Sequence, residues 1–142
     1  MQLLSATHLI AVLRLLATLG LTTAQQTQLL GLDARAVRLA LQTGRPLPLS
    51  PEQQQRIRLS VAIARAVHVL YNRYPEQWFT RENARSPFDG RTPLAYVRAG
   101  GTAALVATHR SLLADLNGPF STSPESRALA SRLPQPDIDL DE

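Results

Sequence analysis

The sequence predicts an all-α protein. Apolar residues recur three or four positions apart in several segments, and capping residues and glycines separate these segments. No stretch alternates apolar and polar residues as a half-buried strand does, so no sheet is expected. A chain of 142 residues is the size of one ordinary domain and can bury a core. The predicted organisation is a helix-turn-helix module (1–49), a long connecting helix (50–74), a small helical module (75–118) and a flexible acidic tail (119–142).

The first helix is predicted over residues 7–19, with Thr7 as N-cap and Gly20 as the stop. This apolar opening is not expected to be a secretory signal, because Arg14 lies inside it and no basic residue precedes it. No segment reaches the roughly 18 uncharged apolar residues of a membrane span. We therefore expect a soluble, cytoplasmic protein that does not bind membranes.

Two short helices follow, and together they outline a helix-turn-helix. Thr22 or Thr23 caps the first, which Gly31 ends, and Asp33 caps the second, which Gly44 closes. In the second helix we expect an inward stripe of Val37, Ala40 and Leu41. The opposite face then carries Arg35, Arg38 and Gln42, with Arg45 beyond the helix end, and is predicted to bind DNA in the major groove.

Two residues of this helix pair leave a second interpretation open. Gln26 and Thr27 stand where such modules usually carry an apolar residue and a small alanine. The pair therefore either reads DNA or only packs against the rest of the chain.

Three residues predict the start of the long helix: Ser50 as N-cap, Pro51 at the first helical position and Glu52 in the first turn. It is predicted to continue to about Tyr74. Two adjacent apolar stripes run along it, which indicates burial against more than one neighbour. The stripes are Ile57, Val61, Ala64, Val67 and Tyr71, and Leu59, Ile63, Ala66 and Leu70.

The module after Pro75 is predicted to begin with one further helical turn and an irregular segment over residues 81–91. Thr92 and Pro93 then begin a short helix, which Gly100 and Gly101 break. A last amphipathic helix runs to residue 116 and ends at Asn117 and Gly118.

Composition excludes several chemistries. The chain has no Cys, which removes disulfide scaffolds, thiolate zinc sites and Cys nucleophiles. No phosphate-cradling glycine pattern, nucleophile elbow or metal-spaced His pair is present. The three histidines, His8, His68 and His109, lie on different predicted helices without an obvious acidic partner. We expect no enzyme activity, no cofactor and no metal.

The segment of residues 78–101 holds the one Trp, an Asp-Gly turn and two prolines between helical regions. Its ordered residues are Trp78, Asn83, Phe88, Gly90, Arg91, Thr92, Pro93 and Leu94, followed by Gly100. This order resembles the signature of the toxin-binding domain of Xre/MbcA/ParS-type antitoxins. A fainter likeness extends over residues 21–117, while Phe79, Glu82 and Asp89 depart from the usual pattern.

The resemblance implies the antitoxin of a type II toxin–antitoxin pair, which binds and neutralises a RES-domain toxin that degrades NAD⁺. We further expect a homodimer that represses its own operon through operator DNA, because one short helix contacts few bases and two copies supply two half-sites. The toxin-binding residues that the match implies are Trp78, Asn83, Phe88, Gly90, Arg91 and Pro93. An exposed Trp on a segment of fixed turns suits this role, because a rigid surface loses little entropy on docking.

The acidic tail is a second candidate contact with the toxin. Asp137, Asp139, Asp141 and Glu142 alternate with Ile138 and Leu140, so an extended tail presents carboxylates on one side. A cleft that holds the pyrophosphate of NAD⁺ is expected to present Arg or Lys, and these carboxylates are suited to occupy it. The alternative is a tail that serves only solubility.

Two other functions remain open for the whole chain. It is a stand-alone helix-turn-helix regulator if its C-terminal half only dimerises. It is a structural scaffold if it binds neither a toxin nor DNA. For residues 78–101 alone, the alternative is that Trp78 and Phe79 are ordinary core aromatics and that the turns only connect helices.

Overall fold

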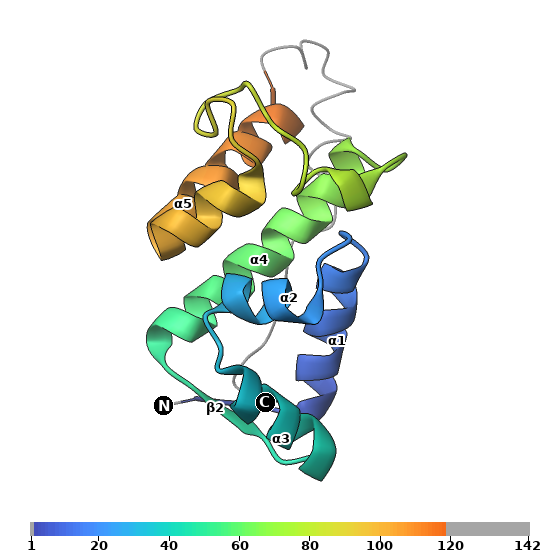
Figure 1. Ribbon diagram of the computed structural model, residues 1–142, viewed down its shortest axis with the longest axis vertical. Helices are drawn as coiled ribbons and strands as arrows, with labels where there is room; N and C mark the ends of the chain where they lie inside the picture. The colour runs from blue at the N-terminus through green and yellow to red at the C-terminus, as the bar shows by residue number, and fades with distance from the viewer. Residues whose placement is uncertain (1, 119–142) are drawn as a thin grey trace.

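The structure is a computed structural model that describes residues 2–118; Met1 and residues 119–142 lie outside the described part. The described residues are mostly helical, as predicted. The central helix is α4, over Pro51–Leu70, and α1, α2 and α5 all pack against it (Figure 1). The buried apolar side chains from Leu4 to Leu112 form one continuous cluster.

The three N-terminal helices begin and end largely at the predicted caps. α1 spans Ala6–Ala17, α2 spans Thr23–Leu30 and α3 spans Ala34–Thr43. Thr22 caps α2 in a reciprocal pair with Gln25, and Asp33 accepts a hydrogen bond from the Ala36 amide at the start of α3. The predicted Thr7 cap of α1 is wrong, because the Ser5 hydroxyl accepts the bond from the His8 amide instead.

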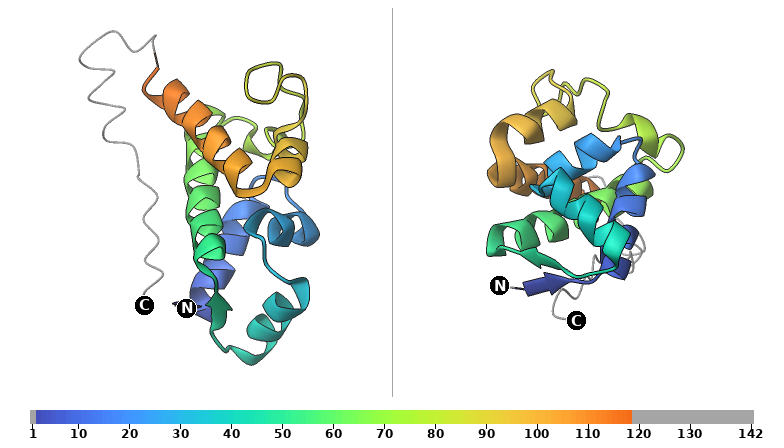
Figure 2. Two further views of the ribbon diagram at one scale, coloured as in Figure 1. Left: turned by 90° about the vertical axis from the view of Figure 1, so that its left-hand side faces the viewer. Right: turned by 60° about the horizontal axis from the view of Figure 1, so that its bottom comes forward.

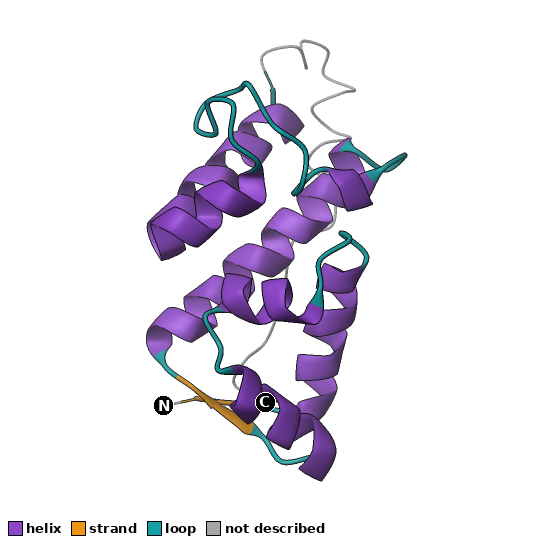
Figure 3. Cartoon of the chain, in the orientation of Figure 1, coloured by secondary structure: helices purple, strands orange, loops and turns teal. Residues whose placement is uncertain are grey.

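The prediction of no strands is also wrong. β1 (Gln2–Leu4) pairs antiparallel with β2 (Leu47–Leu49), with Leu3 opposite Pro48 (Figure 3). Proline favours the extended backbone of β2, and the two leucines of β2 are buried while Pro48 is exposed. Each strand has only 3 residues, which is too short to show a convincing alternation in the sequence.

α4 has the wide buried face that its two stripes predict, but it ends at Leu70 rather than near Tyr74. Tyr71 already leaves the helical region, with φ −127° and ψ 40°. Tyr74 precedes Pro75, whose ring disfavours helical geometry in the preceding residue. The turn that follows is a 3₁₀ helix, η1, over Pro75–Gln77.

The last helix, α5, spans Pro93–Leu116 and is capped by Thr92. The predicted break is present as a kink at Gly101, whose φ of 63° and ψ of −141° are not helical. Figure 2 shows α5 bent back along α4 beyond this point.

Polar contacts tie α4 to both halves of the chain. Arg56 donates to the Gln28 and Leu29 carbonyl oxygens at the end of α2, and Gln53 donates to that of Gly31. A cation and an amide thus satisfy carbonyls that a helix end leaves free. On the other side, Thr102 of α5 donates to Glu52 at 3.0 Å. Among residues 2–118, no helix is both long and apolar enough to cross a bilayer.

Candidate functional site

The loop of residues 80–91, between η1 and α5, is closed by main-chain hydrogen bonds. The Asn83 amide donates to the Arg91 carbonyl at 3.0 Å, and the Gly90 amide donates to the Asn83 carbonyl at 2.8 Å. The Leu94 amide bonds the Phe79 carbonyl at 3.0 Å just outside this closure. The segment is therefore an ordered loop rather than an open connection.

The tip of this loop is held by a local turn. The Phe88 and Asp89 amides donate to the Arg85 carbonyl, and the Arg85 amide donates to Asn83 Oδ1 at 3.0 Å. Asp89 and Gly90 have φ of 51° and 93°. Aspartate tolerates this left-handed region better than most residues and glycine adopts it without cost, which explains the Asp-Gly pair.

Beneath the loop lies a cluster of five aromatic rings: Tyr71, Trp78, Phe79, Phe88 and Tyr96. Trp78 is at its centre, edge-on to Phe79 at 4.9 Å and to Phe88 at 5.6 Å between ring centroids. Tyr71, from the end of α4, stacks on Trp78 with 6.2 Å between the ring centroids. These pairs join α4, the loop and α5 in one packed unit.

The expectation of an exposed Trp78 is wrong, because only 8% of the residue is accessible. Phe88 and Pro93 are buried as well. The physical reason is that the loop has few apolar residues of its own, so its aromatic side chains turn inward to cover the ends of α4 and α5. These three residues support the surface from below.

The predicted residues that do reach the surface are Gly90 and Arg91, while Asn83 is half-buried in the loop closure. The Arg91 Cζ lies 5.3 Å from the Tyr96 ring centroid, in a cation–π arrangement. Trp78, Phe88 and Pro93 thus lie below a surface formed by Gly90, Arg91 and the rest of the loop.

One ion pair fastens the loop to the end of α5. Both terminal nitrogens of Arg85 donate to Asp115, each at 2.6 Å. This bonding raises the pKa of Arg85 further above its ordinary value. Because the Arg85 side chain is largely exposed, the pair orients the loop more than it stabilises the fold.

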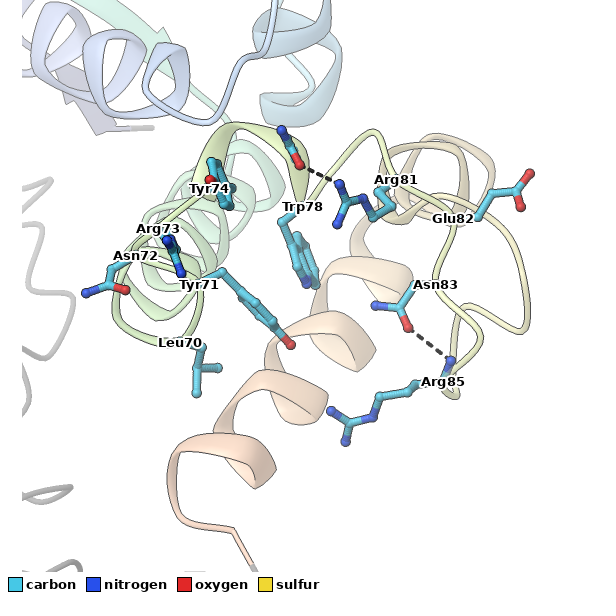
Figure 4. A pocket seen from close by; sticks show the side chains of 11 residues that line it. Leu70, Tyr71, Asn72, Arg73, Tyr74, Trp78, Arg81, Glu82, Asn83 and Arg85 are labelled. Atoms are coloured by element: carbon cyan, nitrogen blue, oxygen red, sulfur yellow. Dashed lines mark hydrogen bonds between the residues drawn. The ribbon is translucent and has the colours of Figure 1, made fainter.

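A pocket of about 430 Å³ opens between the end of α4 and this loop (Figure 4). Tyr71 and Trp78 form one wall, and Asn83 and Arg85 stand opposite them. The Trp78 Nε1 atom is buried without a hydrogen-bond partner among the described residues. The full lining is Leu70, Tyr71, Asn72, Arg73, Tyr74, Gln77, Trp78, Arg81, Glu82, Asn83 and Arg85.

Sequence reasoning missed this pocket and three of its arginines, Arg73, Arg81 and Arg85. The signal available was the density of Arg and Tyr around the end of the long helix, between residues 71 and 85. That signal is weak, since the pocket depends on the chain turning back after Leu70.

The predicted DNA-binding residues all lie on or just after α3. Arg35, Arg38, Gln42 and Arg45 are exposed, as expected for a surface that meets a ligand. Leu41 was expected to face inward but is 40% exposed, and Leu39 is 60% exposed. Only Val37 and Ala40 of the helix are buried, because α3 is short and packs at the edge of the core.

Gln26 and Thr27 are buried despite their polarity. The Gln26 side-chain nitrogen Nε2 donates to the Leu21 carbonyl at 2.8 Å, and the Thr27 hydroxyl donates to the Ala24 carbonyl at 3.0 Å. Their polar groups are thus satisfied locally, and α2 keeps its place in the core without the usual apolar residue.

The histidines remain separate in the fold. His68 Nε2 lies 2.6 Å from the Thr18 hydroxyl, which links α4 to the end of α1, while burial lowers the pKa of His109. Within residues 2–118, no three His, Asp or Glu side chains gather closely enough to hold a metal ion.

The toxin-binding and DNA-binding candidates occupy opposite ends of the described structure (Figure 1). The loop of residues 80–91 lies at one end, next to α5, and α3 lies at the other end, next to β2. The four tail carboxylates, Asp137, Asp139, Asp141 and Glu142, lie outside the described residues. No family model matches the chain, and neither a curated protein nor a solved structure was found to be similar to it.

Proposed function

We propose that the chain is a non-catalytic antitoxin that binds and neutralises a RES-type NAD-degrading toxin. The observation that carries the proposal is the ordered signature from Trp78 to Leu94, whose residues divide into two sets. Trp78, Phe88 and Pro93 build the support, and Gly90 and Arg91 lie on the surface above it. Such a preorganised loop suits docking, because little conformational freedom is lost on binding.

Arg91 is the residue of choice for testing this surface. It is exposed and makes no ion pair among the described residues, so its replacement should leave the fold intact. Co-expression with the RES-domain product of a neighbouring gene, followed by sizing of the complex, tests whether a toxin is bound. Arg91→Glu is expected to weaken that complex by a hot-spot amount, about 2 kcal/mol.

Arg98→Glu is the matched control, since Arg98 is an exposed arginine of α5 outside the loop. Unchanged affinity of a folded Arg91→Glu protein would remove Arg91 from the interface. Absence of any complex with the neighbouring toxin would reject the antitoxin function.

The tail is proposed to contribute to neutralisation by entering the toxin's NAD⁺-binding cleft. Deleting residues 134–142 is expected to leave the complex assembled, because the loop still binds, and to reduce protection against NAD⁺ loss. NAD⁺ levels in cells that express the toxin with each antitoxin form give the measurement. Full protection by the shortened chain would rule out this role.

The exposure of Arg35, Arg38, Gln42 and Arg45 favours operator binding as an accompanying function, or as the main one in a stand-alone regulator. A homodimer would present two copies of α3 to half-sites about one DNA turn apart. Binding should weaken steeply with salt as counterions are released from the phosphates. A gel-shift assay on upstream DNA at low salt tests this, and no shift there would reject it.

A further inference from the structure

The pocket between the end of α4 and the loop is rich in positive charge. Arg73, Arg81 and Arg85 line it, and Glu82 is the one carboxylate among its lining residues. Figure 4 shows the Glu82 carboxylate directed away from the other side chains. The pocket therefore offers donors to a ligand and little negative charge to repel an anion.

Two of these arginines have no carboxylate partner among residues 2–118. Arg85 is engaged by Asp115, whereas Arg81 donates to the amide oxygen of Gln77 at 2.5 Å. Arg73 lies over the Tyr74 ring at 5.9 Å. Their charges remain available to an acidic group that enters the pocket.

A third donor points to the same kind of ligand. Trp78 is more than nine-tenths buried, yet its Nε1–H has no hydrogen-bond acceptor among residues 2–118. Buried polar groups of folded proteins nearly always have a partner, so an unpaired indole N–H on a residue that lines a pocket indicates a missing acceptor. Carboxylate oxygens accept such bonds strongly and also pair with arginine.

We propose that the carboxylates of residues 137–142 of the same chain occupy this pocket. Asp137, Asp139, Asp141 and Glu142 supply four carboxylates, while Ile138 and Leu140 supply apolar side chains between them. The pocket has the complementary pattern, because its lining combines arginines with apolar surface from Leu70, Tyr71 and Trp78. One carboxylate accepts from the Trp78 Nε1–H, and others pair with Arg73 and Arg81.

The path of the chain allows this docking. α5 ends at Leu116, and Asp115 in its last turn holds Arg85, which lines the pocket. The chain therefore leaves the helix beside the pocket. Residues 119–136 span tens of ångströms when extended, at about 3.3 Å per residue, so the acidic segment can return to it. A tethered segment is present at an effective concentration of about millimolar, which favours occupancy by the chain's own tail.

Docking would give the tail two alternative sites. Without a toxin, the carboxylates rest on Arg73, Arg81 and Trp78; with a toxin, they are free to enter its cleft. Only this second half rests on the proposed antitoxin function. The occupancy itself involves this chain alone and is tested without a toxin, so either idea can fail while the other stands.

The single Trp makes a direct test possible, because it gives one indole N–H resonance in a ¹⁵N-correlated NMR spectrum. The full chain is compared with a full-length variant that carries Asp137→Asn, Asp139→Asn, Asp141→Asn and Glu142→Gln. The natural chain is expected to show the indole proton downfield, because a carboxylate acceptor deshields it. High salt should move this resonance toward its position in the variant.

A synthetic peptide of residues 133–142, titrated into the tail-neutralised variant, should restore the downfield position. The same peptide should bind the natural chain at least about tenfold more weakly, because the tethered tail competes. Arg73→Gln with Arg81→Gln should reproduce the empty-pocket resonance, and neutralising the tail of that protein should cause no further shift. Arg98→Gln with Arg110→Gln, exposed arginines of α5 away from the pocket, is the matched control.

Identical indole resonances in the natural and tail-neutralised chains would overturn the proposal, as would a peptide titration without effect. A shift that grows with protein concentration would assign the pocket to the tail of a second copy and would overturn the intramolecular form. An equal response to a peptide with neutral side chains would show that charge is not what the pocket recognises.

Discussion

Trp78 was expected to be an exposed binding residue, but in the structure it belongs to the core. Its ring contacts three other aromatic rings and is 8% accessible, so its removal opens a cavity beneath the loop. A truncation at this position therefore reports on the fold before it reports on any partner.

We expect Trp78→Ala to lower the free energy of unfolding by about 3 kcal/mol or more, the cost of emptying a large buried aromatic site. Trp78→Phe should restore much of this loss, because it keeps a ring between Tyr71 and Phe88. Urea denaturation followed by circular dichroism gives the values. A Trp78→Ala protein as stable as the natural chain would show that the ring is not part of the core.

His109 is expected to make the stability of the fold depend on pH. Burial lowers its pKa below the ordinary value of 6.5, so the unfolded chain binds a proton at a higher pH than the folded chain does. Stability should therefore decrease as the pH falls from about 6.5 through the lowered pKa, whereas above about pH 6.5 His109 should contribute no pH dependence. His109→Asn is expected to flatten the pH dependence of the unfolding midpoint in this window. An unchanged slope would show that another group is responsible.

At the scale of elements, the α5 kink depends on one residue. Gly101 has φ 63° and ψ −141°, a combination that side chains with a Cβ rarely adopt. Space is not the constraint, since the nearest atom to an added Cβ is Arg56 Nη1 at 3.6 Å. The backbone conformation itself therefore requires glycine.

Gly101→Ala is accordingly expected to cost about 1–3 kcal/mol of stability. Arg98→Ala, at an exposed helical position of the same element, should stay within about 0.5 kcal/mol of the natural chain. Thermal unfolding of both variants makes the comparison. If Gly101→Ala were as stable as Arg98→Ala, the kink would not be fixed by its backbone angles.

Helix caps and apolar stripes were the parts of the fold that the sequence could predict. Thr22, Asp33 and Ser50 act within three residues along the chain, so their roles are visible locally. The β1–β2 pair was missed because it joins segments that lie far apart in the chain, as the partners Leu4 and Leu47 show. In the candidate site, spacing identified the loop residues but not which side chains turn inward, and the pocket arises only when Tyr71 and Arg85 meet in the fold.

For the described residues as a whole, the continuous core argues against independent folding of the three predicted segments that lie within residues 2–118. Buried residues from α1 to α5 form one cluster, and Arg56 and Glu52 connect α4 to both halves. Small domains with a shared core usually unfold in one step.

We therefore expect Trp78 fluorescence and far-ultraviolet circular dichroism to give the same unfolding midpoint. The fluorescence reports the region of the loop, and the dichroism reports all the helices. A fluorescence transition at lower denaturant would indicate that residues 75–118 unfold separately, as the predicted division into modules implies.

The two-stranded sheet bears on how the protein behaves in concentrated solution. Pro48 has no amide hydrogen, so Leu3 and Pro48 must form a non-hydrogen-bonded pair of the antiparallel ladder. In such a pair the Pro48 nitrogen points away from β1. The outer edge of β2 thus lacks its central donor and is a poor template for a strand from another molecule. Replacing Pro48 with Val would supply that donor beside a short edge, and light scattering during storage would then be expected to rise.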